Sequence, residues 1–188
     1  MYPILRFTAE MLRARRLPPI GVRETHVSHH RCWPWDIDPW MELNNGRTLT
    51  LYDLGRVPLA VRTGLIGTAR ANGWFVTVAG LSTRYRRRVT PMARFQMRSR
   101  ILGWDARFIY IEQSIWLGAK TEIAANQALL RMAVASKDGL VPTQMVAEAL
   151  GWDTESPTLP DWVQAWIAAE DQRPWPPEDM PDDAPGAA

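Results

Sequence analysis

The stretch Trp33–Leu49, WPWDIDPWMELNNGRTL, joins the first predicted strand of this chain to its longest predicted helix. Asp36 and Asp38 are two residues apart, so on an extended strand both carboxylates project from one face. Asn44 or Asn45 is a good N-cap for the helix, whose first backbone N–H groups lack partners inside it. A carboxylate beside such groups can act as a base or nucleophile while the amides stabilise an oxyanion. Alternatively, both aspartates only cap the helix and favour its dipole.

The chain before this joint predicts a strand and a separate helix. Residues 22–37 are rich in β-branched and aromatic side chains and predict a strand interrupted near Pro34. Residues 1–19 predict an amphipathic helix that ends at its two prolines. One interpretation places residues 1–17 on a membrane surface as a basic amphipathic helix. The other docks this helix on its own domain or on a partner chain.

The chain after the joint predicts one long helix and then four strands. An apolar helical pattern runs from the asparagines past Leu59, and Pro58 predicts a kink or a break in it. Four stretches then predict antiparallel strands, three of them by alternation: residues 74–89, 93–104, 106–117 and 121–136. Two short helices are expected at residues 142–150 and 160–172. The order predicts an α+β fold in which one antiparallel sheet wraps around one long central helix. The uncovered flank of that helix would need a second chain, which predicts a homo-oligomer.

The composition of the chain limits the classes of protein to which it can belong. No apolar run approaches the length of about 18 residues that a membrane-spanning helix needs. The single cysteine, Cys32, excludes a disulfide framework within the chain and fits a cytoplasmic setting. Residues 1–131 hold 20 basic and 9 acidic side chains, a balance of +11, whereas residues 132–188 hold 2 and 11, a balance of −9. This asymmetry predicts an anion-facing body followed by an acidic tail.

The motif D-I-D-x-x-M-x-x-N-N-G-R-x-L at residues 36–49 resembles the signature of the hotdog-fold acyl-CoA thioesterases of the 4-hydroxybenzoyl-CoA thioesterase-like group. The resemblance extends over residues 22–150, through GWFVTVAGLSTRYRRR at 73–88. It implies a hotdog domain over residues 20–151, followed by an acidic, Pro-rich and partly disordered extension at 152–188. It also favours a strand at 121–136, where the alanines by themselves favour a helix.

The resemblance implies hydrolysis of an acyl-CoA thioester without a metal or a dissociable cofactor, in a dimer or tetramer. Asp38 matches the family's catalytic carboxylate, and the backbone N–H of Asn45 matches the group that polarises the thioester carbonyl. In that family the site forms between two subunits. Asp36, Trp40 and Asn44 are then expected to contact the substrate.

Two departures from the family pattern concern the chemistry. The family's usual histidine falls at Glu42 and its usual tyrosine at Thr48. Glu42 near Asp38 would make an acid/base pair of carboxylates; the alternative is that Glu42 points to solvent. The departures favour a rival function, a non-catalytic module that binds acyl-CoA or lipid.

Four arginines end the strand that follows the long helix: Arg84, Arg86, Arg87 and Arg88. Guanidinium groups there would hold the phosphates of coenzyme A. The alternative is a solvated strand face protected from edge pairing by its charge. No nucleic-acid-binding motif accompanies them, so no nucleic-acid partner is expected. His26 and His30 lie about 13 Å apart on a strand, too far for one metal ion.

Overall fold

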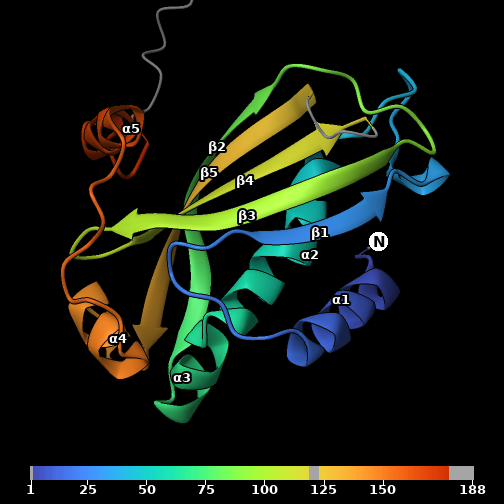
Figure 1. The fold of residues 1–188 in the computed structure, drawn as a ribbon. Coiled ribbons are helices and arrows are strands. Elements are labelled where there is room, and N and C mark those ends of the chain that lie inside the picture. The colour runs from blue at the N-terminus through green and yellow to red at the C-terminus, as the bar shows by residue number, and fades with distance from the viewer. Residues whose placement is uncertain (1, 119–122, 178–188) are drawn as a thin grey trace, which may run out of the picture. The chain divides into compact units, whose positions relative to one another are not determined.

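We analysed a computed structural model that describes residues 2–118 and 123–177 (Figure 1). The chain divides into two compact units, one up to Thr158 and one from Leu159 onward. The second unit contains helix α5, Asp161–Asp171, close to the predicted helix. We expected disorder over residues 173–188 of the C-terminal extension, and residues 178–188 of that stretch lie outside the described residues. Within the described residues no helix is long and apolar enough to cross a membrane.

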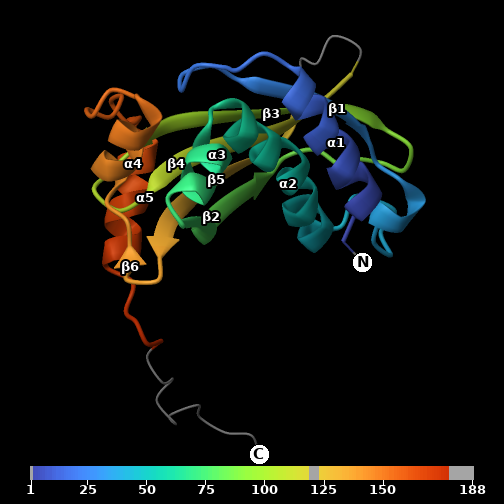
Figure 2. The same cartoon turned by 90° about the horizontal axis from the view of Figure 1, so that it is seen from below.

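The first unit is built on one antiparallel sheet, in which the spatial order is β1-β3-β4-β5-β2 and the short β6 pairs with β5. Its strands are β1 (His26–Arg31), β2 (Phe75–Tyr85), β3 (Arg94–Trp104), β4 (Ile109–Leu117), β5 (Ile123–Ser136) and β6 (Gly139–Leu140). The sheet curls around helix α2, Asn45–Arg62 (Figure 2). The predicted α+β hotdog architecture, including the strand in the alanine-rich segment, is therefore confirmed. The strands β1 and β2 lie at opposite ends of the main strand order.

Helix α2 packs on the sheet through both apolar and polar contacts. Leu51, Leu54 and Leu59 are fully buried in the core. Gln113, on β4, is also fully buried and donates to the backbone oxygen of Tyr52 at 2.9 Å. Because a buried amide needs a hydrogen-bond partner, this bond fixes the position of α2 relative to β4.

A close approach limits one position on α2. A Cβ added at Gly55 would lie 2.5 Å from Ser99 Oγ and 2.7 Å from Met97 Sδ, both on β3. Only glycine lets the helix backbone come so near the strand. The helix also runs through Pro58 to Arg62, so of the predicted kink or break the break is wrong.

Helix α1, Ile4–Arg16, lies against α2. For the inner face of α1, this contact favours the interpretation that the helix docks on its own domain over the interpretation that it lies on a membrane. Glu10 and Ala14 are buried, whereas Leu5 and Leu12 are exposed. Two leucines of the predicted amphipathic helix therefore lie on its exposed outer face.

The remaining differences from the predicted elements are local. Strand β1 ends at Arg31, and Pro34–Asp36 forms a 3-10 turn, so the predicted strand over 22–37 is too long. Helix α3, Leu65–Ala71, was not predicted. Helix α4, Thr143–Leu150, lies where a short helix was expected.

Candidate active site at the N-terminus of helix α2

Asp36 anchors the loop that leads into α2. Its carboxylate is fully buried, and it accepts from Arg6 Nη1 and from Arg47 Nε, each at 2.7 Å. It also accepts the backbone N–H of Trp33 at 3.1 Å, and its own carbonyl accepts from the N–H of Asn44. These bonds leave Asp36 no surface for a ligand in the single chain. Asp36 therefore positions the loop, contrary to the expectation that it contacts substrate.

Asp38 closes a tight turn in the same loop. Its Oδ1 accepts from the N–H of Trp40 at 3.0 Å and of Glu42 at 3.4 Å. Its own N–H donates to the carbonyl of Glu42 at 2.8 Å, and Met41 has a positive φ of 59°. Because the chain turns here, the expectation that Asp36 and Asp38 share one strand face is wrong. Asp38 is half-buried at the loop surface.

The first turn of α2 follows this turn directly. Asn44 is the N-cap, as predicted, and its Oδ1 accepts the N–H of Arg47 at 3.0 Å. The N–H groups of Asn45 and Gly46 come before the first intrahelical bond, so they carry the positive end of the helix dipole. An anionic or polarised oxygen would be favoured there.

A cavity of about 180 Å³ adjoins that first turn. Its lining comes from the turn, from α2, from the end of β2 and the segment after it, and from β5: Glu42, Leu43, Asn45, Thr48, Tyr85, Arg86, Arg87, Arg88, Val89 and Asn126. Burial raises the pKa of Tyr85, so its hydroxyl stays protonated near neutral pH. That hydroxyl donates to the carbonyl of Asn45 at 3.4 Å.

Glu42 is turned toward Arg88 in this cavity. Arg88 Nε donates to its carboxylate at 2.6 Å, and Arg88 Nη2 donates to the carbonyl of Trp40 at 2.9 Å. Both side chains are partly exposed, and exposed pairs contribute only about 0–1 kcal/mol. Glu42 is therefore held at the cavity wall by a contact that a bound anion could replace.

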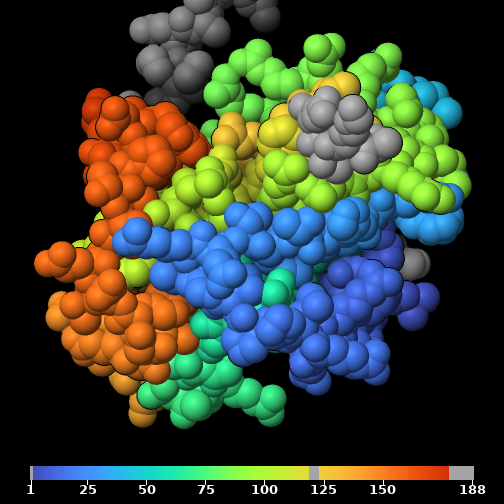
Figure 3. Space-filling model, in the orientation of Figure 1, coloured from blue at the N-terminus to red at the C-terminus, as the bar shows by residue number. Residues whose placement is uncertain are grey.

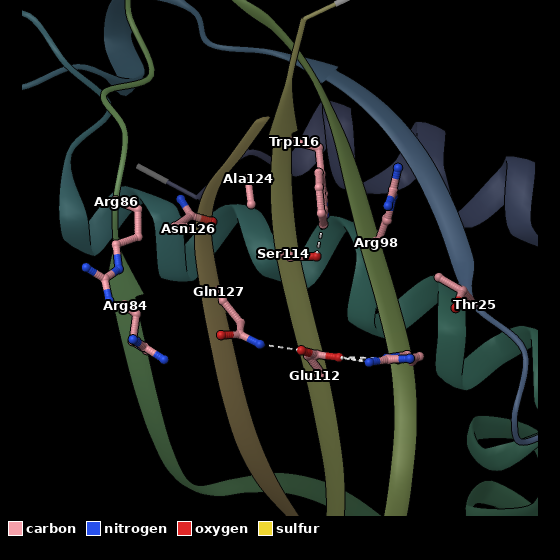
Figure 4. Close-up of a pocket in the computed structure, with 11 residues that line it drawn as sticks. Thr25, Arg84, Arg86, Arg98, Glu112, Ser114, Trp116, Ala124, Asn126 and Gln127 are labelled. Carbon is pink, nitrogen blue, oxygen red and sulfur yellow. Dashed lines mark hydrogen bonds and ion pairs between the residues drawn. The ribbon is translucent and has the colours of Figure 1, made fainter. Parts of the chain in front are cut away.

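A second, larger pocket of about 510 Å³ lies on the sheet face opposite α2 (Figure 4). Arg84, Arg86, Arg98 and Arg100 are among its lining residues, and Glu112 is its one acid. Glu112 already accepts from Arg100 at 2.6 Å and from Gln127. Arg86 and Asn126 line both this pocket and the smaller cavity. The two hollows therefore meet at the end of β2 and the start of β5.

The structure thus gathers only part of the predicted site. Glu42, Asn45 and the arginines at 86–88 surround one cavity, and Arg84 lies in the neighbouring pocket. Asp38 and Trp40 do not line the cavity; Trp40 is 71% exposed.

Five lining residues were not assigned to the site from sequence: Leu43, Thr48, Tyr85, Val89 and Asn126. Tyr85 lies next to the arginines in the sequence. Its alternation with these charged residues was the signal that could have assigned it to the site. Asn126 comes from β5, about 80 residues beyond the motif, and is also the acceptor for Tyr52. No pattern in the sequence connects it to the motif. In the part of the chain that the structure describes, no group of three or more metal-ligating side chains forms a metal site.

Residues 32–167 match the family model described as the thioesterase-like superfamily. A protein named THEM6 from Xenopus laevis is 29% identical over 162 residues, covering 86% of this chain and 76% of the relative. The protein of the same name from Danio rerio is 36% identical over 96 residues, covering 51% of this chain and 48% of the relative.

Solved structures of thioesterases share the fold. The probable thioesterase YbaW from Escherichia coli has a TM-score of 0.62 at 16% identity, covering 66% of this chain and 96% of that one. A 4-hydroxybenzoyl CoA thioesterase complexed with 4-hydroxybenzoyl CoA has a TM-score of 0.59 at 12% identity, covering 67% and 98%. Because the family model spans most of the chain, this chain belongs to the thioesterase-like superfamily, and it shares the fold of these hotdog-fold thioesterases.

Proposed function

We propose that this protein hydrolyses an acyl-CoA thioester to a carboxylate and free coenzyme A. One observation carries the proposal: Glu42, the first turn of α2 at Asn45 and the arginines at 86–88 surround one cavity, next to the turn closed by Asp38. The cavity combines a carboxylate, helix N–H groups and cationic side chains. These are the groups that acyl transfer from a phosphate-bearing carrier requires.

In the proposed reaction Asp38 is the general base. It takes a proton from a water molecule, whose oxygen attacks the thioester carbonyl carbon, while the backbone N–H of Asn45 stabilises the developing oxyanion. The oxyanion then collapses to a carboxyl group, the carbon–sulfur bond breaks, and the departing thiolate takes up the proton that Asp38 received, so that coenzyme A leaves as a thiol. Glu42 is the second carboxylate near the reacting carbonyl.

The arginines supply the proposed binding site for the coenzyme A phosphates. Arg86 borders both the cavity and the pocket on the outer sheet face, so a ligand can extend from one hollow into the other. Neither Arg84 nor Arg86 makes an ion pair within the described residues. Guanidinium groups in such a setting match phosphate oxygens well.

We also propose that two copies pair through β2. This strand has 11 residues, lies at the end of the strand order, and exposes Phe75, Val78 and Leu81. A long exposed edge with apolar side chains is a template for another strand. Since Tyr85 and the arginines that follow β2 line the cavity, a partner on this edge would lie beside the site.

A second candidate function is binding of acyl-CoA without hydrolysis. The observation that favours it is the ion pair between Glu42 and Arg88, at the position where the family pattern has histidine. A paired glutamate provides no imidazole for proton transfer.

The test measures thiol release from a panel of acyl-CoA substrates by wild type, by Asp38→Asn and by the matched control Asp138→Asn on an exposed turn. Loss of a general base costs about 100-fold or more, so we expect that loss for Asp38→Asn and none for the control. Undiminished hydrolysis by Asp38→Asn would contradict the role of Asp38. Saturable acyl-CoA binding without turnover by wild type would support the binding module.

A further inference from the structure

The outer face of α1 exposes apolar side chains. Leu5, Ala9, Leu12 and Arg16 follow the spacing i, i+4, i+7 and i+11 and lie on one helical stripe, and all four are exposed. Leu5 is 87% exposed and Leu12 is 48% exposed. Helix α1 lies at the surface beside β1 (Figure 3). Exposed apolar side chains that lie together on one helical stripe can mark a contact surface.

The charge on this face has one sign. Exposed Arg15 and Arg16 flank the leucines, whereas the helix's one acid, Glu10, is buried on the opposite side and paired with Arg13 at 2.7 Å. The outer face therefore combines leucines with cations and carries no carboxylate. This is the arrangement by which a surface helix lies at the boundary between lipid headgroups and acyl chains.

A cationic pocket of about 670 Å³ continues this face toward β1 and β3. Ala9 and Arg13 of α1 line it together with Arg31 and Arg94. Its one acid is Glu10, which is already paired with Arg13. Arg31 lies directly opposite Arg94 in the antiparallel register. Like charges placed directly opposite each other are unfavourable unless an anion lies between them. The pocket is therefore suited to a phosphate group held next to the apolar stripe.

We propose that the outer face of α1 and the adjoining arginine pocket bind an anionic phospholipid surface. The leucines of the stripe enter the headgroup boundary, and the arginines contact lipid phosphates. A second copy paired through β2 would leave this face open, because α1 lies beside β1 and β1 is at the other end of the main strand order. The proposal is independent of the proposed hydrolysis.

The test is flotation of the full chain with vesicles of phosphatidylcholine alone and of phosphatidylcholine with phosphatidylglycerol. We expect wild type to bind the anionic vesicles and to bind the neutral ones much less. Leu5→Gln with Leu12→Gln should lower the partition coefficient roughly tenfold or more for each leucine. Arg15→Gln with Arg16→Gln should lower it about fivefold for each arginine.

Matched control variants change exposed residues elsewhere in the first unit. Leu140→Gln with Met145→Gln controls for apolar exposure, and Arg70→Gln with Arg107→Gln controls for net charge; neither pair should alter binding. Circular dichroism checks that every variant is folded.

Failure of wild type to bind anionic vesicles would overturn the proposal, as would unchanged binding by the Leu5 and Leu12 variant. A change of oligomeric state in that variant, with vesicle binding intact, would assign the face to a contact between copies instead.

Discussion

The buried carboxylate of Asp36 and the guanidinium of Arg47 meet at 2.7 Å, which ties the loop before α2 to the first turn of that helix. Arg6 of α1 contacts the other oxygen of the same carboxylate. One side chain thus connects the N-terminal helix, the loop with the proposed base, and the helix with the proposed oxyanion donor. The geometry of the candidate site depends on this connection.

Replacing Asp36 should strongly destabilise the fold. Asp36→Asn removes the negative charge and leaves the partly buried Arg6 and Arg47 without it, which typically costs about 3–5 kcal/mol. Urea unfolding measures the free energy of unfolding. Asp138→Asn, on an exposed turn, is the control and should change it by no more than about 0.5 kcal/mol. Equal stability of the two variants would contradict the anchoring role.

A glycine-to-alanine pair tests the packing of α2 on β3. Gly55→Ala should destabilise by roughly 1–3 kcal/mol, because its Cβ would meet Ser99 and Met97. Gly67→Ala on α3 meets nothing within 4 Å and should stabilise by about 0.4–1 kcal/mol. Thermal unfolding of both variants checks that their changes in stability have opposite signs. A stabilising Gly55→Ala would contradict the close contact between α2 and β3.

One buried and one half-buried histidine predict a loss of stability in acid. Burial, with Arg62 nearby, lowers the pKa of His26 to about 4, and burial, with Arg6 as the next cause, lowers that of His30 to about 3. The unfolded chain binds these protons near pH 6.5, before the folded chain does, so stability should fall as the pH drops from about 6.5 toward 4.

Unfolding in urea at a series of pH values measures this slope. His26→Asn with His30→Asn should flatten it, even if the variant is less stable at neutral pH. The exposed His29→Asn is the control and should keep the wild-type slope. A slope unchanged by the double variant would assign the acid sensitivity to other groups.

The arginines beside the cavity should act on the nucleotide end of the substrate. Arg86→Gln with Arg87→Gln should raise KM for an acyl-CoA about tenfold or more, since hydrogen bonds to charged groups contribute about 1.5–3 kcal/mol. The KM for the same acyl group on pantetheine, which lacks the nucleotide phosphates, should not change. Steady-state kinetics with Arg70→Gln as control checks this; an equal effect on both substrates would refute a phosphate contact.

The proposed pairing through β2 should be sensitive to charge. Val78→Lys with Leu81→Lys places cations on the exposed edge strand, where a paired copy would bring like charges together. Sedimentation should show a dimer or larger assembly for wild type and for the control Leu140→Lys, and a monomer for the double variant. A wild-type monomer at micromolar concentration would contradict a site shared between subunits.

The sequence by itself determined the order and type of most elements. Alternation marked β3 and β4, and the pair Asn44 and Asn45 marked the start of α2, because these signals depend on neighbours within a few residues. The D-x-D and N-N pattern then pointed to the family. The local signal at Pro58 was misleading, because α2 continues through this residue without a break.

Only the tertiary structure decided how the polar groups are used. Asp36 is drawn into the interior by arginines 30 residues before it and 11 after it, and Glu42 is paired by Arg88 across 46 residues. The cavity takes Asn126 from a strand that no local pattern links to the motif, and α1 buries Glu10 while its leucines face outward. Helix and strand periodicity follow from local backbone geometry, whereas these pairings depend on which distant surfaces the folded chain brings into contact.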